Sequence, residues 1–197
     1  MLNQATYDQI AGLYTVRQAD RGGSFADLSA AFAARLPRVA DVADLGCGPA
    51  GDGALLAQAG HRVTGIDRSA RMLAHAARAL PGRVIRADLR RLPVASQSMD
   101  GIWCCASLLH VPHDQTMAAL GEMRRILRPR GCLALVTAAG QSARLEPVPY
   151  APGAQRWFFY RTAAELEEQV RGARLQVEAM TEETTNRHWL KILACAA

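Results

Sequence analysis

A short apolar segment that runs into a glycine-rich turn constrains the fold of this chain most strongly. Val42-Ala43-Asp44-Leu45 has the composition of a buried strand, Gly46-Cys47-Gly48-Pro49-Ala50-Gly51 follows it, and a helical pattern begins at Asp52. Glycine lets the backbone come close to a ligand, and the first N–H groups of a helix point outward, free to bind it. A strand, a glycine turn and a helix in this order predict a site for a nucleotide-type cofactor.

Strand and helix patterns alternate along the chain, which predicts an α/β domain with a parallel sheet and helices on both faces. Three predicted strands end at Asp44, Asp67 and Ala87. Four more cover 101–105, 132–137, 174–181 and 188–194. The last two of these are predicted to form an antiparallel hairpin. The predicted helices cover 3–19, 25–36, 52–60, 69–79, 114–127 and 162–171.

Two segments stand apart from this alternation. Residues 1–37 are expected to form lead-in helices, the second of them capped by Ser24. Residues 138–160 contain several prolines and glycines and show no periodicity, so they predict a long loop. Because such loops in compact domains are usually functional, we expect this one to be a substrate-side flap on a single domain of residues 1–197.

Two classes of cofactor compete for the glycine turn. Gly46-x-Gly48-x-x-Gly51 matches the dinucleotide pattern, and Asp67 ends the next strand 67 − 46 = 21 residues later, as expected for NAD. However, Asp44 places negative charge where a pyrophosphate would lie, whereas S-adenosylmethionine (SAM) carries an ammonium group. Pro49 also removes an N–H from the turn. A third acid, Asp88, ends another strand 88 − 67 = 21 residues further on, and the pattern therefore favours SAM.

These segments resemble those of the class I SAM-dependent methyltransferases, in particular small members with an Asp-Leu-Gly-Cys-Gly-Pro motif. The resemblance implies a Rossmann-like, doubly wound seven-stranded sheet of order 3-2-1-4-5-7-6 whose last strand is antiparallel. The sequence departs from the family at Ala50 and Arg130, where such sequences usually carry glycine. The matching segments are 44–49, 65–73, 87–93, 99–103, 109–112 and 122–131.

The resemblance also assigns roles at the cofactor site. Asp67 is expected to accept hydrogen bonds from both ribose hydroxyls. Asp88 is expected to accept from the adenine amino group, with the Leu89 N–H near a ring nitrogen, unless Asp88 pairs with a neighbouring arginine. Asp44 either orients the turn or contacts the SAM ammonium through water, and Tyr14 either closes over the methionine carboxylate or packs on the core. The other candidates on the cofactor side are Gly46, Gly48, Arg68 and Cys105.

Residues that would act on the acceptor are harder to assign, because methyl transfer from SAM needs mainly alignment and desolvation. His110 follows the fourth strand and is a candidate general base, or else it orients its loop. His113 faces the substrate or caps the following helix. Aromatic and basic residues near the end of the flap line an acceptor pocket or anchor the flap: Arg156, Phe158 and Tyr160, together with Trp157.

Composition narrows the possible partners. The net charge is +5, from 23 basic and 18 acidic residues, but the arginines are scattered rather than gathered with aromatic residues, which disfavours a nucleic-acid surface. The five cysteines lack Cys-x-x-Cys spacing, so we expect core positions and no metal. No signal peptide or membrane-spanning run is evident, which predicts a cytoplasmic monomer or homodimer without membrane contact.

The sequence therefore predicts an enzyme that transfers a methyl group from SAM to oxygen or nitrogen of a small molecule, with S-adenosylhomocysteine (SAH) as product. A tRNA methyltransferase of the wobble-uridine type is one alternative, because some of these enzymes have a similar Leu-His segment after the fourth strand, here Leu109-His110. An NAD-binding oxidoreductase is another. A cofactor-binding scaffold without catalysis is a third, motivated by Ala50.

Overall fold

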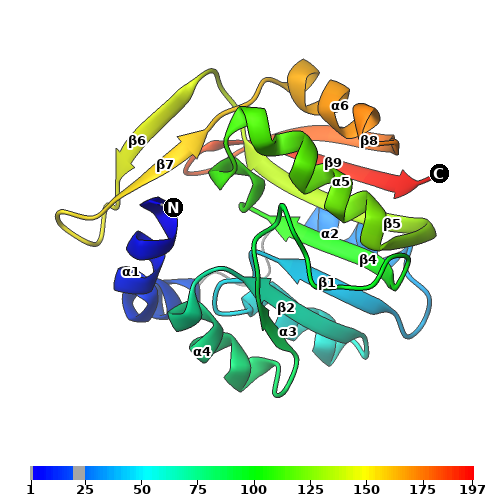
Figure 1. The fold of residues 1–197 in the computed structure, drawn as a ribbon, viewed down its shortest axis with the longest axis horizontal. Coiled ribbons are helices and arrows are strands. Elements are labelled where there is room, and N and C mark those ends of the chain that lie inside the picture. The colour runs from blue at the N-terminus through cyan, green and yellow to red at the C-terminus, as the bar shows by residue number, and fades with distance from the viewer. Residues whose placement is uncertain (1, 20–24) are drawn as a thin grey trace.

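A twisted seven-stranded sheet forms the centre of the computed structural model, which describes residues 2–19 and 25–197 (Figure 1). Its strand order is β3-β2-β1-β4-β5-β9-β8, and β9 runs antiparallel to both of its neighbours. This confirms the predicted order 3-2-1-4-5-7-6 once the separate β6–β7 pair is set aside. The sheet strands are β1 (Asp41–Leu45), β2 (Arg62–Asp67), β3 (Val84–Arg86), β4 (Met99–Cys105), β5 (Leu127–Ala138), β8 (Leu175–Thr184) and β9 (His188–Ala196).

Helices cover both faces of the sheet, as the alternating pattern predicts. Strand β1 shows why: Val42 faces the layer of α2, α3 and α4, whereas Ala43 and Leu45 face the layer of α5 and α6. Because successive strand residues point to opposite faces, a fully apolar strand needs a helix layer on each side. The helices are α1 (Leu2–Ala19), α2 (Ala26–Ala33), α3 (Gly51–Gln58), α4 (Ala70–Ala79), α5 (Thr116–Ile126) and α6 (Ala163–Gly172), with short 3-10 helices η1 (Leu108–His110) and η2 (His113–Gln115).

Two of the helix starts are fixed by side-chain caps. The Ser69 hydroxyl accepts a hydrogen bond from the Met72 N–H at 3.0 Å and thereby begins α4. Thr162 and Glu165 form a reciprocal capping box at α6. The predicted cap of the second lead-in helix, Ser24, lies outside the described residues. None of the described helices is both long and apolar enough to cross a bilayer.

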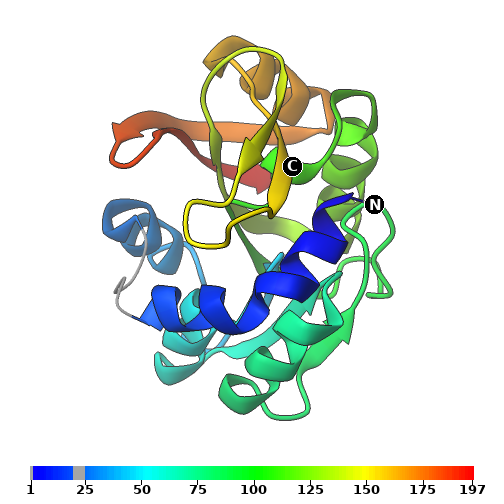
Figure 2. The same ribbon diagram turned by 90° about the vertical axis from the view of Figure 1, so that its left-hand side faces the viewer.

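The prediction of an irregular loop over residues 138–160 was wrong, because this segment forms an antiparallel pair. Strands β6 (Ala143–Pro147) and β7 (Gln155–Phe159) hydrogen-bond to each other and lie beside α1 (Figure 2). Most of the prolines and glycines fall in the connection between the two strands, where turns need them. The aromatic residues of β7 favour a strand. The prolines and glycines of the neighbouring turn led to the loop prediction for the whole segment.

Strand β5 begins at Leu127, five residues before the predicted start at Cys132, and it contains a strained residue. Arg130 has φ = 65° and an exposed side chain. A residue with a Cβ in this left-handed region costs about 1–2 kcal/mol relative to an ordinary conformation. The glycine that similar sequences carry here avoids that strain.

We therefore expect Arg130→Gly to raise the free energy of unfolding by roughly 0.5–1 kcal/mol, since relief of strain exceeds the entropic cost of glycine. Urea denaturation measures the change. A matched substitution, Arg78→Gly near the end of α4, should lower the free energy of unfolding by about 1 kcal/mol, because its backbone is helical. A loss of stability in Arg130→Gly would contradict the argument.

Candidate functional site

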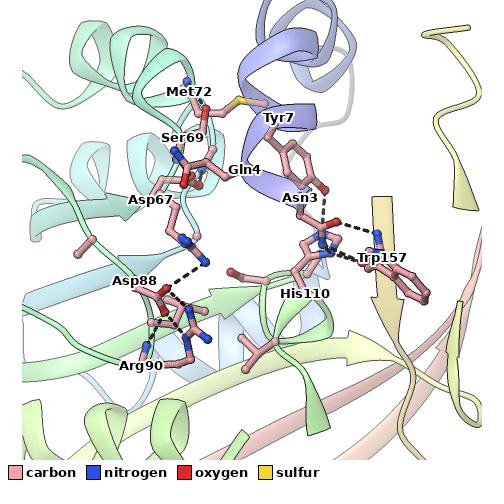
Figure 3. A pocket seen from close by; sticks show the side chains of 18 of the residues that line it. Asn3, Gln4, Tyr7, Asp67, Ser69, Met72, Asp88, Arg90, His110 and Trp157 are labelled. Atoms are coloured by element: carbon pink, nitrogen blue, oxygen red, sulfur yellow. Dashed lines mark hydrogen bonds and ion pairs between the residues drawn. The ribbon is translucent and has the colours of Figure 1, made fainter. Parts of the chain in front are cut away.

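A large cavity opens at the carboxyl ends of β1, β2 and β4, and its volume is about 720 Å³. This edge is the point where the strand order reverses, and open α/β sheets bind their ligands there. In Figure 3, Asp67 and Ser69 lie on one side of the cavity with Asp88 and Arg90 below them, and His110 and Trp157 lie on the opposite side.

The glycine turn forms one wall of this cavity without side chains of its own. Gly46 and Gly48 have φ values of 71° and 53°, in the region that glycine adopts freely. A Cβ at Gly46 would overlap the side chain of Ser107, and a Cβ at Gly48 would lie 3.7 Å from the ring of Tyr14. The Gly46 N–H donates to the Ile66 carbonyl at 2.7 Å, which holds the turn against β2. The turn thus leaves room for a ligand to meet backbone directly.

Asp67 connects the glycine turn to the start of α4. Its Oδ2 accepts from the Gly48 N–H at 3.0 Å and its Oδ1 accepts from the Ser69 N–H at 2.8 Å. Burial raises the pKa of this carboxyl above its usual range, although the backbone donors oppose the shift. A carboxylate offers about four lone-pair sites, so each oxygen still has one for an additional donor. The residue is therefore positioned to receive a pair of hydroxyl groups.

Asp88, in contrast, is engaged by arginine. Its carboxylate lies 2.5 Å from Arg90 Nη2 and 3.0 Å from Arg68 Nη1, and Arg90 also hydrogen-bonds to Gln115. The hydrogen bonds from Arg90 lower the pKa of Asp88 to about 2. Of the two roles that the sequence leaves open for Asp88, the structure thus shows the arginine pair, while contact with adenine stays a prediction.

Asp44 lies behind the turn rather than in the cavity. Its buried side chain faces Gly53 of α3, so closely that a Cβ on that glycine would come within 2.6 Å of Oδ2. Burial raises its pKa well above the usual range for an aspartate. Asp44 thus lies against the start of α3, and both of its predicted roles, orienting the turn and contacting the SAM ammonium through water, stay predictions.

Helix α1 and strand β7 close the other side of the cavity through side-chain-to-backbone hydrogen bonds. Asn3 Oδ1 accepts from the Trp157 N–H at 2.7 Å, and Asn3 Nδ2 donates to the Trp157 carbonyl at 2.9 Å. Thr6 adds a bond to the Gln155 carbonyl at 2.6 Å. These contacts join segments about 150 residues apart in the chain, and no local pattern in the sequence predicts them.

His110 lies at the centre of this wall and is partly buried. Its Nδ1 is 2.9 Å from the Trp157 carbonyl and its Nε2 is 2.7 Å from the Tyr7 hydroxyl. Since a carbonyl only accepts, we assign the proton of the neutral ring to Nδ1, and Nε2 then accepts from Tyr7. Burial lowers the pKa of His110 to about 4, so the imidazole is neutral at physiological pH.

This shift predicts a loss of stability in acid. The pKa of His110 is lower in the folded state than the ordinary histidine value of about 6.5, so the unfolded state binds the proton more readily between these two pKa values. The free energy of unfolding should fall as the pH drops below about 6.5, by roughly 3 kcal/mol when pH 4 is reached.

Urea unfolding of the protein and of His110→Gln at pH 7 and pH 4 measures this contribution. The fall in stability between the two pH values should be smaller in His110→Gln, while His75→Gln on α4 serves as control and should behave like the parent. Equal acid sensitivity of the parent and His110→Gln would contradict the assignment.

The structure brings most of the predicted residues to this cavity and leaves others outside. Tyr14 lines both this cavity and a smaller one nearby. His113 packs edge-on against Phe159 and does not line either cavity. Tyr160 is buried, and its hydroxyl contacts Glu146 and Arg187. The remaining predicted residues that line the large cavity are Gly46, Gly48, Asp67, Arg68, Asp88, Leu89, Cys105 and His110.

The acceptor-side candidates on β7 are divided by the alternation of the strand. Trp157 and Phe159 line the large cavity, whereas Arg156 and Phe158 line the smaller one. In a strand, successive side chains point to opposite sides, but a loop has no such alternation. Because we interpreted this segment as a loop, the sequence could not show which of these four residues face the same cavity. Other residues at the large cavity that the sequence did not predict include Asn3, Gln4, Ser107 and Gln115.

Comparison with known proteins identifies the domain. Residues 42–131 match a family model described as a methyltransferase domain. The chain is 40% identical over 115 residues to the malonyl-[acyl-carrier protein] O-methyltransferase of Enterobacter lignolyticus, a match that covers 57% of this chain and 45% of that protein. Over residues 42–131 the chain is thus similar to methyltransferase domains of the class I SAM-dependent type.

Further similarities agree with this methyltransferase domain. The trans-aconitate 2-methyltransferase of Escherichia coli is 42% identical over 108 residues, which cover 52% of this chain and 41% of that protein. The match thus spans less than half the length of either relative. A solved 1,6-didemethyltoxoflavin-N1-methyltransferase from Burkholderia thailandensis, with SAH bound, superposes with a TM-score of 0.79 at 24% identity and covers 100% of this chain and 88% of its own.

The methyltransferase domain offers no metal centre within the described residues, since no group of three or more His, Cys, Asp or Glu side chains converges there. The described cysteines form no disulfide with one another, and Cys104 and Cys132 are buried in β4 and β5. Burial raises the pKa of the Cys104 thiol to about 12, which fits a packing role.

Proposed function

We propose that this protein transfers the methyl group of SAM to an oxygen or nitrogen of a small-molecule acceptor by in-line displacement. The observation that carries the proposal is the large cavity, in which the glycine turn and Asp67 face a wall formed by α1, His110 and β7. Its volume of about 720 Å³ lies within the range of small-molecule and cofactor sites.

The residues at one end of the cavity fit SAM. Gly46 and Gly48 leave a surface that a Cβ would fill, and Asp67 retains a free lone pair on each oxygen for ribose hydroxyls. The Leu89 backbone and the Asp88–Arg90 pair border the adenine end, while Tyr14 borders the methionine end. When bound there, SAM supplies an electrophilic methyl group.

The other end of the cavity offers a place for the acceptor. Trp157 and Phe159 supply apolar surface, which aligns the acceptor and excludes water as displacement requires. His110 Nε2 can hold a proton only if the Tyr7 hydroxyl turns away from it. In the proposed reaction His110 therefore either takes a proton from an acceptor hydroxyl or amine that displaces Tyr7, or else fixes the position of Tyr7.

The relatives support both acceptor atoms, because one is named an O-methyltransferase and another an N1-methyltransferase. An oxidoreductase is less well supported. Lys191, the single lysine of the sequence, is 2.6 Å from Asp27 and 2.8 Å from Glu183 on a part of the sheet that does not line the cavity.

Thermal unfolding with SAM, SAH and NADH tests this proposal, each ligand being added near saturation. A ligand present at 100 times its dissociation constant stabilises the folded state by about 2.7 kcal/mol, which raises the melting temperature by several degrees. SAM and SAH should raise it and NADH should not. A shift with NADH alone would contradict the proposal, and no shift with any ligand would favour a scaffold that has lost its cofactor.

Transfer itself is then followed with SAM that carries a labelled methyl group. The acceptors are supplied as two pools, small metabolites and total tRNA. Label in small molecules alone is the expected result, and label in tRNA would instead support the wobble-uridine alternative.

A further inference from the structure

A second, smaller cavity of about 80 Å³ lies behind the wall formed by Tyr7 and His110. It shares Tyr7, Tyr14, Ala106 and His110 with the large cavity, so the two adjoin along these four residues. Its charged lining is entirely basic within the described residues: Arg17, Arg156 and Arg187 contribute to it, and no aspartate or glutamate does.

One of these arginines, Arg156, forms no ion pair with any carboxylate in the described part of the chain. Arg156 Nη1 donates to the Tyr7 hydroxyl at 3.2 Å, and its guanidinium packs 5.0 Å from the centre of the Phe158 ring. Its Nε is buried and has no hydrogen-bond partner in the described part of the chain. Since a buried donor without a partner is costly, this geometry indicates a group that the cavity is built to receive.

The nearest candidate for a partner within the chain is already used. Glu146 faces Arg156 across the β6–β7 pair, but its carboxylate bonds to Arg187 at 2.8 Å and to the Tyr160 hydroxyl. The guanidinium of Arg187 packs on Phe158 as well, at 4.3 Å from the ring centre. Glu146 therefore forms its ion pair with Arg187, and it attracts the charge of Arg156 without bonding to it.

We propose that the small cavity binds a carboxylate group of the acceptor, with Arg156 as its principal ligand. This inference rests on the proposed methyl transfer and specifies its substrate class: an acceptor that carries a carboxylate apart from the atom that receives the methyl group. The planar guanidinium fork matches a carboxylate in two parallel hydrogen bonds. The volume is large enough for a carboxylate but small for a second ring or chain.

The shared residues explain how one molecule can use both cavities. The Tyr7 hydroxyl contacts Arg156 on one side and His110 Nε2, 2.7 Å away, on the other. A carboxylate held by Arg156 thus lies on the far side of Tyr7 from SAM, and it anchors the acceptor while the reacting atom occupies the large cavity. The separation also keeps negative charge away from Asp67 and Asp88.

Binding of carbon-13-labelled acetate, followed by NMR at constant ionic strength, tests the proposal with and without SAH. Acetate should bind with a dissociation constant in roughly the millimolar range, and its neutral counterpart acetamide should bind at least about tenfold more weakly. Arg156→Gln should weaken acetate binding at least about tenfold, and Arg156→Lys should weaken it less, because the charge remains and the fork is lost.

The control is Arg78→Gln, which removes the same charge from the outer side of α4 and should bind acetate like the parent. The SAH dissociation constant, measured for every variant, should stay within about twofold of the parent. Equal binding of acetate by the parent and Arg156→Gln, or tighter binding of inorganic phosphate than of acetate, would overturn the carboxylate assignment. Failure of the parent protein to bind SAH would instead reject the proposed function. The acetate titration without SAH tests the carboxylate site independently of that result.

Discussion

Replacing Asp67 with alanine is expected to raise the dissociation constants of SAM and SAH at least about 100-fold. The structure leaves one lone pair free on each oxygen of Asp67, and the proposed ribose hydroxyls would fill both. Each hydrogen bond to a charged group contributes about 1.5–3 kcal/mol, so loss of two accounts for a change of this size. The substitution also removes the acceptor of the Gly48 and Ser69 N–H groups, which loosens the turn itself.

Calorimetric titration of SAH measures this effect, and Glu168→Ala provides the control. Glu168 is an exposed carboxylate on α6, far from the lining of the cavity, so its removal should leave the affinity unchanged. Thermal unfolding without ligand shows whether Asp67→Ala is still folded. A folded Asp67→Ala that binds SAH like the parent would remove Asp67 from the cofactor site.

The second large effect concerns Arg161, for which we expect the change to methionine to lower the free energy of unfolding by about 3 kcal/mol or more. The Arg161 side chain is fully buried, and burial lowers its pKa to about 10. It donates to the carbonyls of Phe159 at 2.8 Å and Val111 at 3.0 Å, and to the Thr116 hydroxyl at 2.6 Å. Methionine fills similar space but leaves these acceptors buried without donors.

Arg161 connects β7, the segment after η1 and the start of α5. Its loss should therefore also disturb the cavity wall that α1, His110 and β7 form. The melting temperature should fall by roughly 6–12 °C. The control is Arg171→Met on α6, whose exposed ion pair with Glu167 contributes less than about 1 kcal/mol. If Arg161→Met melted within about 2 °C of Arg171→Met, the buried hydrogen bonds would have to be assigned a far smaller role.

The sequence predicts the sheet well, and it predicts which residues follow the strands at the cavity, because both signals are local. Each strand is a short apolar run, and the residue that follows it, such as Gly46 or Asp67, reaches the carboxyl edge of the sheet by topology alone. The strand order follows from the family resemblance, and the structure confirms it. Arg161, by contrast, carries no pattern that separates it from the exposed arginines of the same chain.

The cavity wall formed by α1, His110 and β7 was only partly predictable, for a different physical reason. It forms where α1 meets β7, through contacts such as Asn3 with Trp157 that span most of the chain. A pairing between distant segments leaves no periodicity in either of them. His110 was correctly placed beside the cavity, but its partner Tyr7 depends on how α1 packs, which the sequence of the helix does not specify.

Strand β7 has a consequence for how this protein could be altered, because one cavity lies on each side of the strand. Side chains at 157 and 159 face the large cavity, and those at 156 and 158 face the small one. Under the proposed function, substitutions at 157 and 159 can therefore reshape the space around the reacting atom and leave the carboxylate site at Arg156 unchanged. Substitutions at 156 and 158 can change that carboxylate site alone. A combinatorial library over these four codons would explore two nearly independent specificities within a single strand.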